Sequence, residues 1–125
     1  MKKTQYTLHD HYRKKARRSH WDLRIVRPDG RKAWSFALPK SELPKKGKRL
    51  LAIKTPDHKL SIMDLEGKLH GKHEGDTLKI IETGECQIVR HNSVHITILF
   101  KGKILNGLFA FVELEDDNWL MIASK

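Results

Sequence analysis

The chain has 125 residues, a length typical of one domain spanning residues 1–125 and sufficient to bury a core without staples. No apolar run approaches the roughly 20 residues needed to cross a bilayer. The N-terminal segment lacks the apolar stretch of a secretory signal, and the single cysteine, Cys86, excludes an intrachain disulfide. We therefore expect a cytoplasmic monomer without membrane contact.

The charge is large and unevenly distributed. The net charge is +10; residues 1–54 hold 17 Lys and Arg against 4 Asp and Glu, whereas residues 55–125 hold 8 against 11. A basic half on a folded domain is typical of proteins that bind a polyanion, so we expect nucleic acid as the partner.

Strand-like alternation dominates the chain. Residues 20–26 alternate polar and apolar side chains with a period of two and then meet the turn sequence Arg27-Pro28-Asp29-Gly30. With a second strand at residues 33–38, residues 20–38 are predicted to form a hairpin. Further strands are expected at residues 50–53, 77–81, 87–90, 94–100, 107–114 and 118–123, with a basic loop at 41–48.

Helix has little room in this pattern, with at most one turn each at residues 13–18 and 60–65. Seven or eight short strands predict an all-β fold. A closed barrel and a sandwich both fit this spacing.

The chemistry is concentrated in the sequence His20-Trp21-Asp22-Leu23-Arg24. Residues two apart in a strand share a face, so His20, Asp22 and Arg24 point one way, opposite a core face with Trp21 and Leu23. An imidazole next to a carboxylate forms part of a site for Mn²⁺ or Zn²⁺, and the guanidinium can clamp a phosphate. A simple surface ion pair between Asp22 and Arg24 is the plainer interpretation.

A second histidine upstream strengthens the metal interpretation. His11 follows the apolar-bearing segment of residues 6–8 in a region rich in Arg and Lys, and His9 competes with it as a ligand. Cationic side chains around neutral imidazoles and one carboxylate suit a site that receives an anion. Cys86 shows no local sign of an activated nucleophile.

At this point the chain resembles the 3′-phosphoesterase domain of bacterial and archaeal DNA ligase D, as a stand-alone version. The resemblance is carried by His11, by His20-Trp21-Asp22-Leu23-Arg24 and by Trp34-Ser35-Phe36-Ala37-Leu38-Pro39-Lys40. It continues through Asp57-His58 and Asp64-Leu65-Glu66-Gly67 to the final strands, over about residues 6–125.

The resemblance implies a small closed β-barrel enzyme that depends on Mn²⁺, with Co²⁺ or Zn²⁺ as possible substitutes. It implies removal of a 3′-terminal ribonucleoside or 3′-phosphate from DNA or RNA primer strands in repair by end joining, leaving a 3′-OH. It also implies a separate DNA ligase, polymerase or Ku-type protein as a partner. By position, the resemblance implies that the metal ligands are His11, His20 and Asp22 and that the phosphate contacts are Arg24, Lys40, Arg49 and His58. It implies that the catalytic residues are His20, Asp22, Arg24 and His58.

Some positions depart from the family pattern. The stretch between the first two histidines is longer, a tyrosine is replaced by Ile62, a glutamate by Pro56, and a Gly-Tyr-Gly-rich loop by residues 70–76. A phenol can donate a hydrogen bond to phosphate and an isoleucine cannot, so we expect a bias away from bare 3′-phosphates.

Two other functions fit parts of the sequence. A non-catalytic single-strand-binding barrel would use Trp21, Trp34 and Phe36 as stacking platforms, although Trp21 is expected on the core side. An iron oxygenase with two histidines and one carboxylate would need a basic cosubstrate-binding residue late in the chain, where the net charge is −3.

Overall fold

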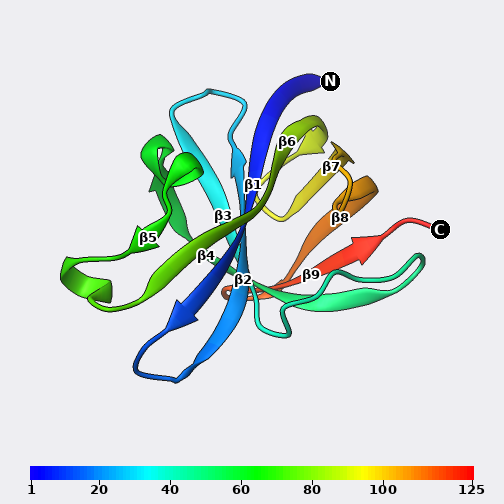
Figure 1. Cartoon of the computed structure of the whole chain (residues 1–125). Coiled ribbons are helices and arrows are strands. Elements are labelled where there is room, and N and C mark those ends of the chain that lie inside the picture. The colour runs from blue at the N-terminus through cyan, green and yellow to red at the C-terminus, as the bar shows by residue number, and fades with distance from the viewer.

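The computed structural model covers all 125 residues, and its regular secondary structure consists mostly of β-strands (Figure 1). The strands are β1 (Lys2–Arg13), β2 (Arg18–Val26), β3 (Lys32–Leu38), β4 (Arg49–Lys59), β5 (Gly67–Lys68), β6 (Thr77–His91), β7 (His95–Lys101), β8 (Asn106–Glu115) and β9 (Asn118–Ala123). Two single-turn 3₁₀ helices, η1 (Leu60–Asp64) and η2 (Gly71–His73), complete the secondary structure. No helix is long and apolar enough to cross a membrane.

The strands form one antiparallel sheet that closes on itself. The order is β1-β2-β3-β4-β9-β8-β7-β6, and β6 pairs back with β1, while the short β5 is attached only to β6. Closure removes the open edges that would otherwise present unpaired backbone groups. The predicted all-β class is confirmed, and the ring of eight strands with β5 beside it is barrel-like.

The core follows from the period-two alternation of each strand. Tyr6 and Leu8 of β1, with Leu23 and Ile25 of β2, point into the ring and are fully buried. Phe36 of β3 stacks on Phe111 with ring centroids 4.7 Å apart and meets Trp119 edge-on at 5.5 Å. The predicted core face of β2 is confirmed for Leu23 and Ile25, and Trp21 packs partly buried against the same core.

The hairpin predicted at residues 20–38 is confirmed as β2 and β3. Its turn uses Gly30 in the left-handed region, with φ of +69°, and the Gly30 N–H donates to the Arg27 carbonyl at 2.9 Å. Glycine adopts this conformation without a Cβ penalty, which explains why Gly30 can end the turn.

Four local expectations are corrected by long-range pairing. Residues 13–18 form no helical turn, because they connect β1 to β2 as a hairpin. No strand was expected before residue 20, whereas Lys2–Arg13 form the twelve-residue strand β1. The strand expected at 50–53 continues to Lys59. The strands expected at 77–81 and 87–90 are one strand, β6, because β1 pairs along most of its length. The helical turn expected at 60–65 is confirmed as η1.

Candidate metal and phosphate site

The site lies on the outer face of β1 and β2, on the side opposite the core. The register aligns His11 with His20, His9 with Asp22, and Thr7 with Arg24. Because side chains alternate along each strand, all six of these residues point away from the apolar interior. Pairing of β1 with β2 therefore collects histidines from two separate sequence segments around one carboxylate.

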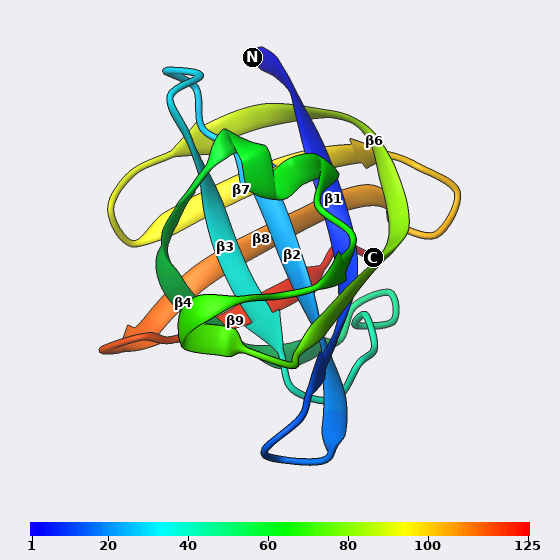
Figure 2. The same cartoon turned by 60° about the vertical axis from the view of Figure 1, so that its left-hand side comes forward.

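A connecting segment, residues 60–76, crosses this outer face and covers it (Figure 2). The Thr7 hydroxyl donates to the carbonyl of Met63 at 2.8 Å, and His9 Nε2 donates to the carbonyl of Leu65 at 2.9 Å. As a result Asp22 and Arg24 are each only 4% exposed. Asp22 and Arg24 do form an ion pair, but the pair is buried, so its interpretation as a surface pair is wrong.

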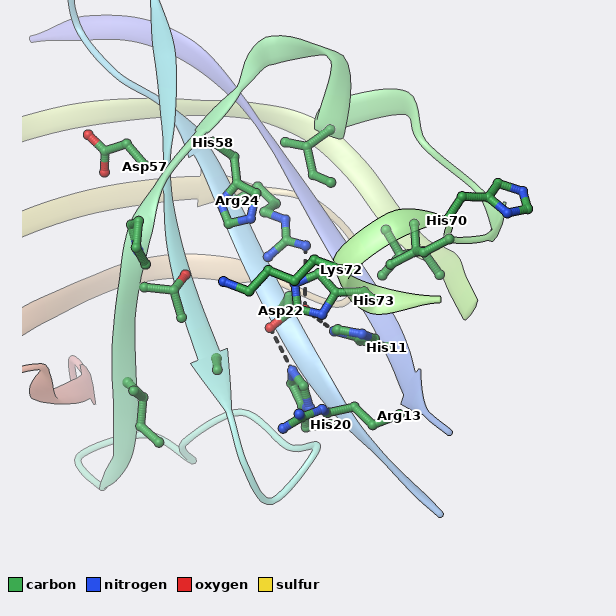
Figure 3. A pocket seen from close by; sticks show the side chains of 17 residues that line it. His11, Arg13, His20, Asp22, Arg24, Asp57, His58, His70, Lys72 and His73 are labelled. Atoms are coloured by element: carbon green, nitrogen blue, oxygen red, sulfur yellow. Dashed lines mark hydrogen bonds and ion pairs between the residues drawn. The ribbon is translucent and has the colours of Figure 1, made fainter. Parts of the chain in front are cut away.

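Asp22 is the centre of the polar cluster (Figure 3). Its Oδ2 lies 2.9 Å from His11 Nδ1, and its Oδ1 lies 2.8 Å from His20 Nε2. The candidate ligand atoms of His11, His20 and Asp22 all lie within 4.8 Å of one another. These are the three side chains expected to hold a metal.

The electrostatics of the cluster favour an ionised carboxylate. Burial acts to raise the pKa of Asp22, but hydrogen bonds from His11 and His20 and the charge of Arg24 outweigh it and hold the pKa well below its usual range. The hydrogen bond to Asp22 raises the pKa of His11, against the opposing effect of burial. The protons that His11 and His20 share with Asp22 occupy the positions that a cation would take.

His9 has a different environment from His11, although both lie on the same face of β1. Its Nε2 is bound to the Leu65 carbonyl, and its Nδ1 is buried without a hydrogen-bond partner. Burial lowers the pKa of His9. The geometry favours His11 as the third member of the cluster and leaves His9 beneath the covering segment.

Arg24 and His58 adjoin the cluster on the side of β3 and β4. Arg24 Nη1 donates to the Ser35 hydroxyl at 2.6 Å, and Nη2 lies 3.4 Å from Asp22 Oδ2. Arg24 Nε and His58 Nδ1 are buried without partners. Burial, followed by the charge of Arg24, lowers the pKa of His58, so its ring is largely neutral at neutral pH.

A cavity of about 630 Å³ opens over this constellation (Figure 3). One side carries His11, His20, Asp22, Arg24 and His58, and the lining includes Arg13 and Lys72 as well as apolar side chains such as Ile62. Lys40 and Arg49 are exposed and are not among the lining residues. The contact of Lys40 and Arg49 with a phosphate stays a prediction. That phosphate would belong to a part of the nucleic acid that lies outside the cavity.

One polar residue of the site was missed from sequence. Asp76 is buried, and its Oδ2 lies 2.9 Å from His11 Nε2, on the opposite side of the ring from Asp22. It precedes β6 in a loop that shows no local motif around it. Since His11 and Asp76 are 65 residues apart, only the closed sheet and the covering segment bring them together.

The donor set suits a divalent transition metal. Two imidazole nitrogens and one carboxylate oxygen match the ligands of Mn²⁺, Co²⁺ and Zn²⁺. Histidines that bind a metal through one ring nitrogen are commonly oriented by a carboxylate that accepts a hydrogen bond from the other ring nitrogen. Asp76 lies in that position beside His11 Nε2. The residues present therefore fit a single metal ion held by His11, His20 and Asp22.

Fold and site together define a small barrel-like β-protein with a buried His-His-Asp cluster and an arginine beneath one open cavity. The profile of the DNA ligase D 3′-phosphoesterase domain matches residues 9–113, and the chain belongs to this family. The family resemblance inferred from sequence is thereby confirmed, and with it the class of phosphoesterase. A comparison with curated proteins gave no match.

Proposed function

We propose that this protein is a metal-dependent hydrolase that removes 3′-terminal ribonucleosides or 3′-phosphates from nucleic acid strands and leaves a 3′-OH. The observation that carries the proposal is the convergence of His11, His20 and Asp22, with ligand atoms within 4.8 Å, under a cavity that also receives Arg24 and His58. Membership of the 3′-phosphoesterase family supports the same chemistry.

In this proposal His11, His20 and Asp22 hold the cation. When bound there, a divalent cation such as Mn²⁺ would supply positive charge for a phosphate oxygen and would lower the pKa of a water. Arg24, held by Ser35 and Asp22, lines the cavity and would present its guanidinium donors to the equatorial oxygens. These donors are oriented before the substrate arrives, so little reorganisation is needed during the reaction.

His58 has the properties of a proton carrier. In the free site burial, followed by the charge of the nearby Arg24 guanidinium, lowers the pKa of His58 and favours the neutral ring. An entering phosphate brings negative charge that offsets Arg24 and favours the protonated ring. His58 then either pairs with the phosphate as an imidazolium or donates its proton to the leaving oxygen.

A nucleic acid 3′ end fits the charge around the cavity. Arg13 and Lys72 line its wall, and the connection from Arg13 to Arg18 adds exposed cations beside it. Affinity is expected to fall as salt rises, because each phosphate contact releases counterions. A DNA ligase, polymerase or Ku-type partner would act on the resulting 3′-OH in end joining.

The non-catalytic single-strand-binding function has weaker support. Phe36 is fully buried, and Trp21 and Trp34 are partly buried against the core, so these rings do not form an exposed stacking surface.

The deciding experiment incubates the protein with primers that end in one ribonucleotide or in a 3′-phosphate, with Mn²⁺ or with EDTA. We expect Mn²⁺-dependent appearance of a 3′-OH end, detected by extension with a polymerase. Binding of the primer without any change at its 3′ end would contradict the proposal and favour a binding protein.

A further inference from the structure

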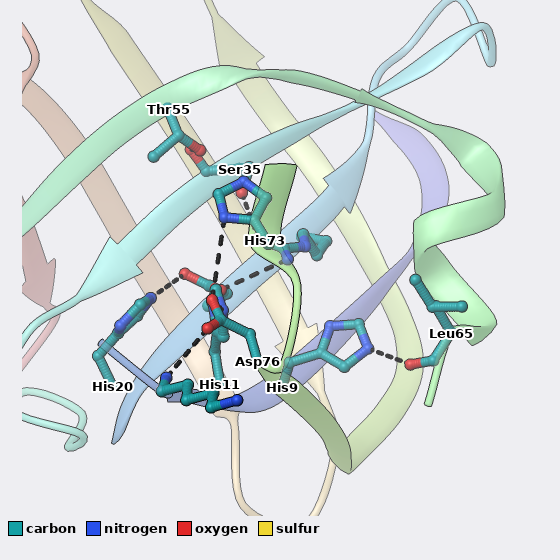
Figure 4. A network of polar contacts seen from close by, with 11 residues as sticks. His9, His11, His20, Ser35, Thr55, Leu65, His73 and Asp76 are labelled. Carbon is teal, nitrogen blue, oxygen red and sulfur yellow. Dashed lines mark hydrogen bonds and ion pairs between the residues drawn. The ribbon is translucent and has the colours of Figure 1, made fainter. Parts of the chain in front are cut away.

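Asp76 is a buried carboxylate that bridges two parts of the site (Figure 4). One oxygen, Oδ2, lies 2.9 Å from His11 Nε2, and the other, Oδ1, accepts the backbone N–H of Lys14 at 3.0 Å. Lys14 follows β1 directly, so this carboxylate ties the β1–β2 connection to the loop before β6. Hydrogen bonds at both oxygens fix its orientation.

The imidazole of His11 is held between two carboxylates. Nδ1 faces Asp22 at 2.9 Å and Nε2 faces Asp76 at 2.9 Å. A neutral imidazole has one N–H donor and one lone pair, and only the lone pair binds a cation. A lone pair on Nε2 would point at the Asp76 carboxylate and be repelled, whereas an N–H there makes a charge-assisted hydrogen bond.

We propose that Asp76 is a positioning residue that keeps the proton of His11 on Nε2 and directs the Nδ1 lone pair toward Asp22 and His20. The inference rests on the proposed function, because it concerns affinity for the metal assigned there. Asp76 itself is not among the residues that line the cavity. Its Oδ2 is hydrogen-bonded to the lining residue His11 at 2.9 Å, whereas the exposed ring of His73 lies further away at 3.9 Å, so its effect on the metal site is expected to pass through His11.

A purely structural role is the alternative. In that case Asp76 would only secure the β1–β2 connection through Lys14 N–H, and its loss would lower stability without changing metal affinity. The two roles separate when metal affinity is measured on folded protein.

The variants are Asp76→Ala, which removes both acceptors, and Asp76→Asn, which keeps the size and one acceptor. Glu74→Ala is the matched control, because Glu74 is an exposed carboxylate of the same loop that bonds His70 and Gly71 N–H and does not touch His11. Free Mn²⁺ is followed by electron paramagnetic resonance during titration, with thermal unfolding as the check on folding.

We expect Asp76→Ala to weaken Mn²⁺ binding by about 10- to 100-fold, the usual effect of losing a partner that orients a metal-bound histidine. Asp76→Asn should show a smaller loss, and Glu74→Ala should match the parent. The Asn variant carries the test if the Ala variant does not fold. In Zn²⁺-loaded parent protein, ¹⁵N NMR should show the His11 proton on Nε2, and this signal should weaken in Asp76→Ala.

Equal Mn²⁺ affinity in parent and folded Asp76 variants would overturn the inference and leave the proposed function standing. An equal loss of Mn²⁺ affinity in Glu74→Ala would also overturn the inference, because the negative charge of the loop, and not the contact with His11, would then be the cause. If the parent bound no Mn²⁺, the metal assignment of the proposed function would fail, and this inference with it.

Discussion

Two carboxylates in this molecule, Asp22 and Glu82, have lowered pKa values for different reasons. Burial opposes both shifts. At Asp22 it is outweighed by two imidazoles and a guanidinium; at Glu82 it is outweighed by backbone N–H groups of the turn after β7 and by the Tyr6 hydroxyl. The Glu82 bonds span 2.6–2.9 Å, from Tyr6, Lys103, Ile104 and Leu105.

The kind of partner separates a structural carboxylate from a reactive one. The donors to Glu82 are amide and phenol protons that a metal does not replace at neutral pH. The imidazole donors to Asp22 release their protons readily, so a cation can take their place. The Glu82 cluster is also tightly closed, since a Cβ at Gly102 would collide with the Tyr6 hydroxyl and the Glu82 carboxylate. A lowered carboxylate pKa alone therefore does not identify an active site.

In the comparison of Asp22 with Glu82, the largest effect is expected for the substitution Asp22→Asn. Loss of one anionic ligand should reduce Mn²⁺-dependent 3′-end release by a factor of at least about 10³. The amide is preferred to Asp22→Ala, because it removes the charge but keeps the size of the side chain and polar atoms for His11 and His20. Loss of the anion beside buried Arg24 is expected to lower stability by about 3–5 kcal/mol in either variant. Initial rates on a primer with one 3′-ribonucleotide measure the effect, with circular dichroism to check the fold. A rate equal to the parent would show the metal assignment to be wrong.

Arg24→Lys tests the neighbouring cation. An ammonium cannot reproduce the planar donors that contact Ser35 and face the cavity, so we expect a loss of about 1–3 kcal/mol in transition-state stabilisation. Steady-state kinetics should show this as a lower kcat. Arg90→Lys is the matched control: Arg90 of β6 is exposed and is not among the residues that line the cavity, so its rate should be unchanged. Near-normal turnover in Arg24→Lys would count against its role.

Glu82→Gln should affect stability and leave the reaction unchanged. We expect the free energy of unfolding to fall by about 1–2 kcal/mol at pH 7, from weaker charge-assisted hydrogen bonds. Because the folded pKa of Glu82 lies below its unfolded value near 4.5, its contribution is present above that pH and is lost as pH falls through the lowered folded pKa. Urea unfolding of both proteins from pH 7 to pH 3 should show their difference shrinking in acid. If the difference in unfolding free energy between the two proteins stayed the same from pH 7 to pH 3, this explanation would be wrong.

The smallest expected effect concerns Ile62, which lines the cavity without offering a donor. The family resemblance indicates a tyrosine here, and one missing neutral hydrogen bond is worth about 0.5–1.5 kcal/mol. We expect the parent to process a 3′-ribonucleotide several-fold better than a 3′-phosphate, and Ile62→Tyr to reduce that preference. The measurement compares initial rates on matched primers that end in a 3′-ribonucleotide or a 3′-phosphate. The same preference in the parent and in Ile62→Tyr would contradict this prediction.

Much of the fold was predictable from local pattern. Alternation at residues 20–38 correctly predicts β2, β3 and the turn between them, and the common face of His20, Asp22 and Arg24 follows from strand geometry alone. The boundaries of β1, β4 and β6 were not predictable, because those strands are extended by partners far away in sequence.

The sequence by itself determined the strand pattern, the chemical types of the ligands and the excess of positive charge, because these depend on residue identity and on a period of two. His9 and His11 are equivalent in that local pattern. Only the tertiary structure distinguished them, by setting the β1–β2 register and covering His9 with the Leu65 carbonyl. The same long-range packing buried Asp22 and Arg24 and brought Asp76 to His11, since contacts across 65 residues depend on how the ring closes.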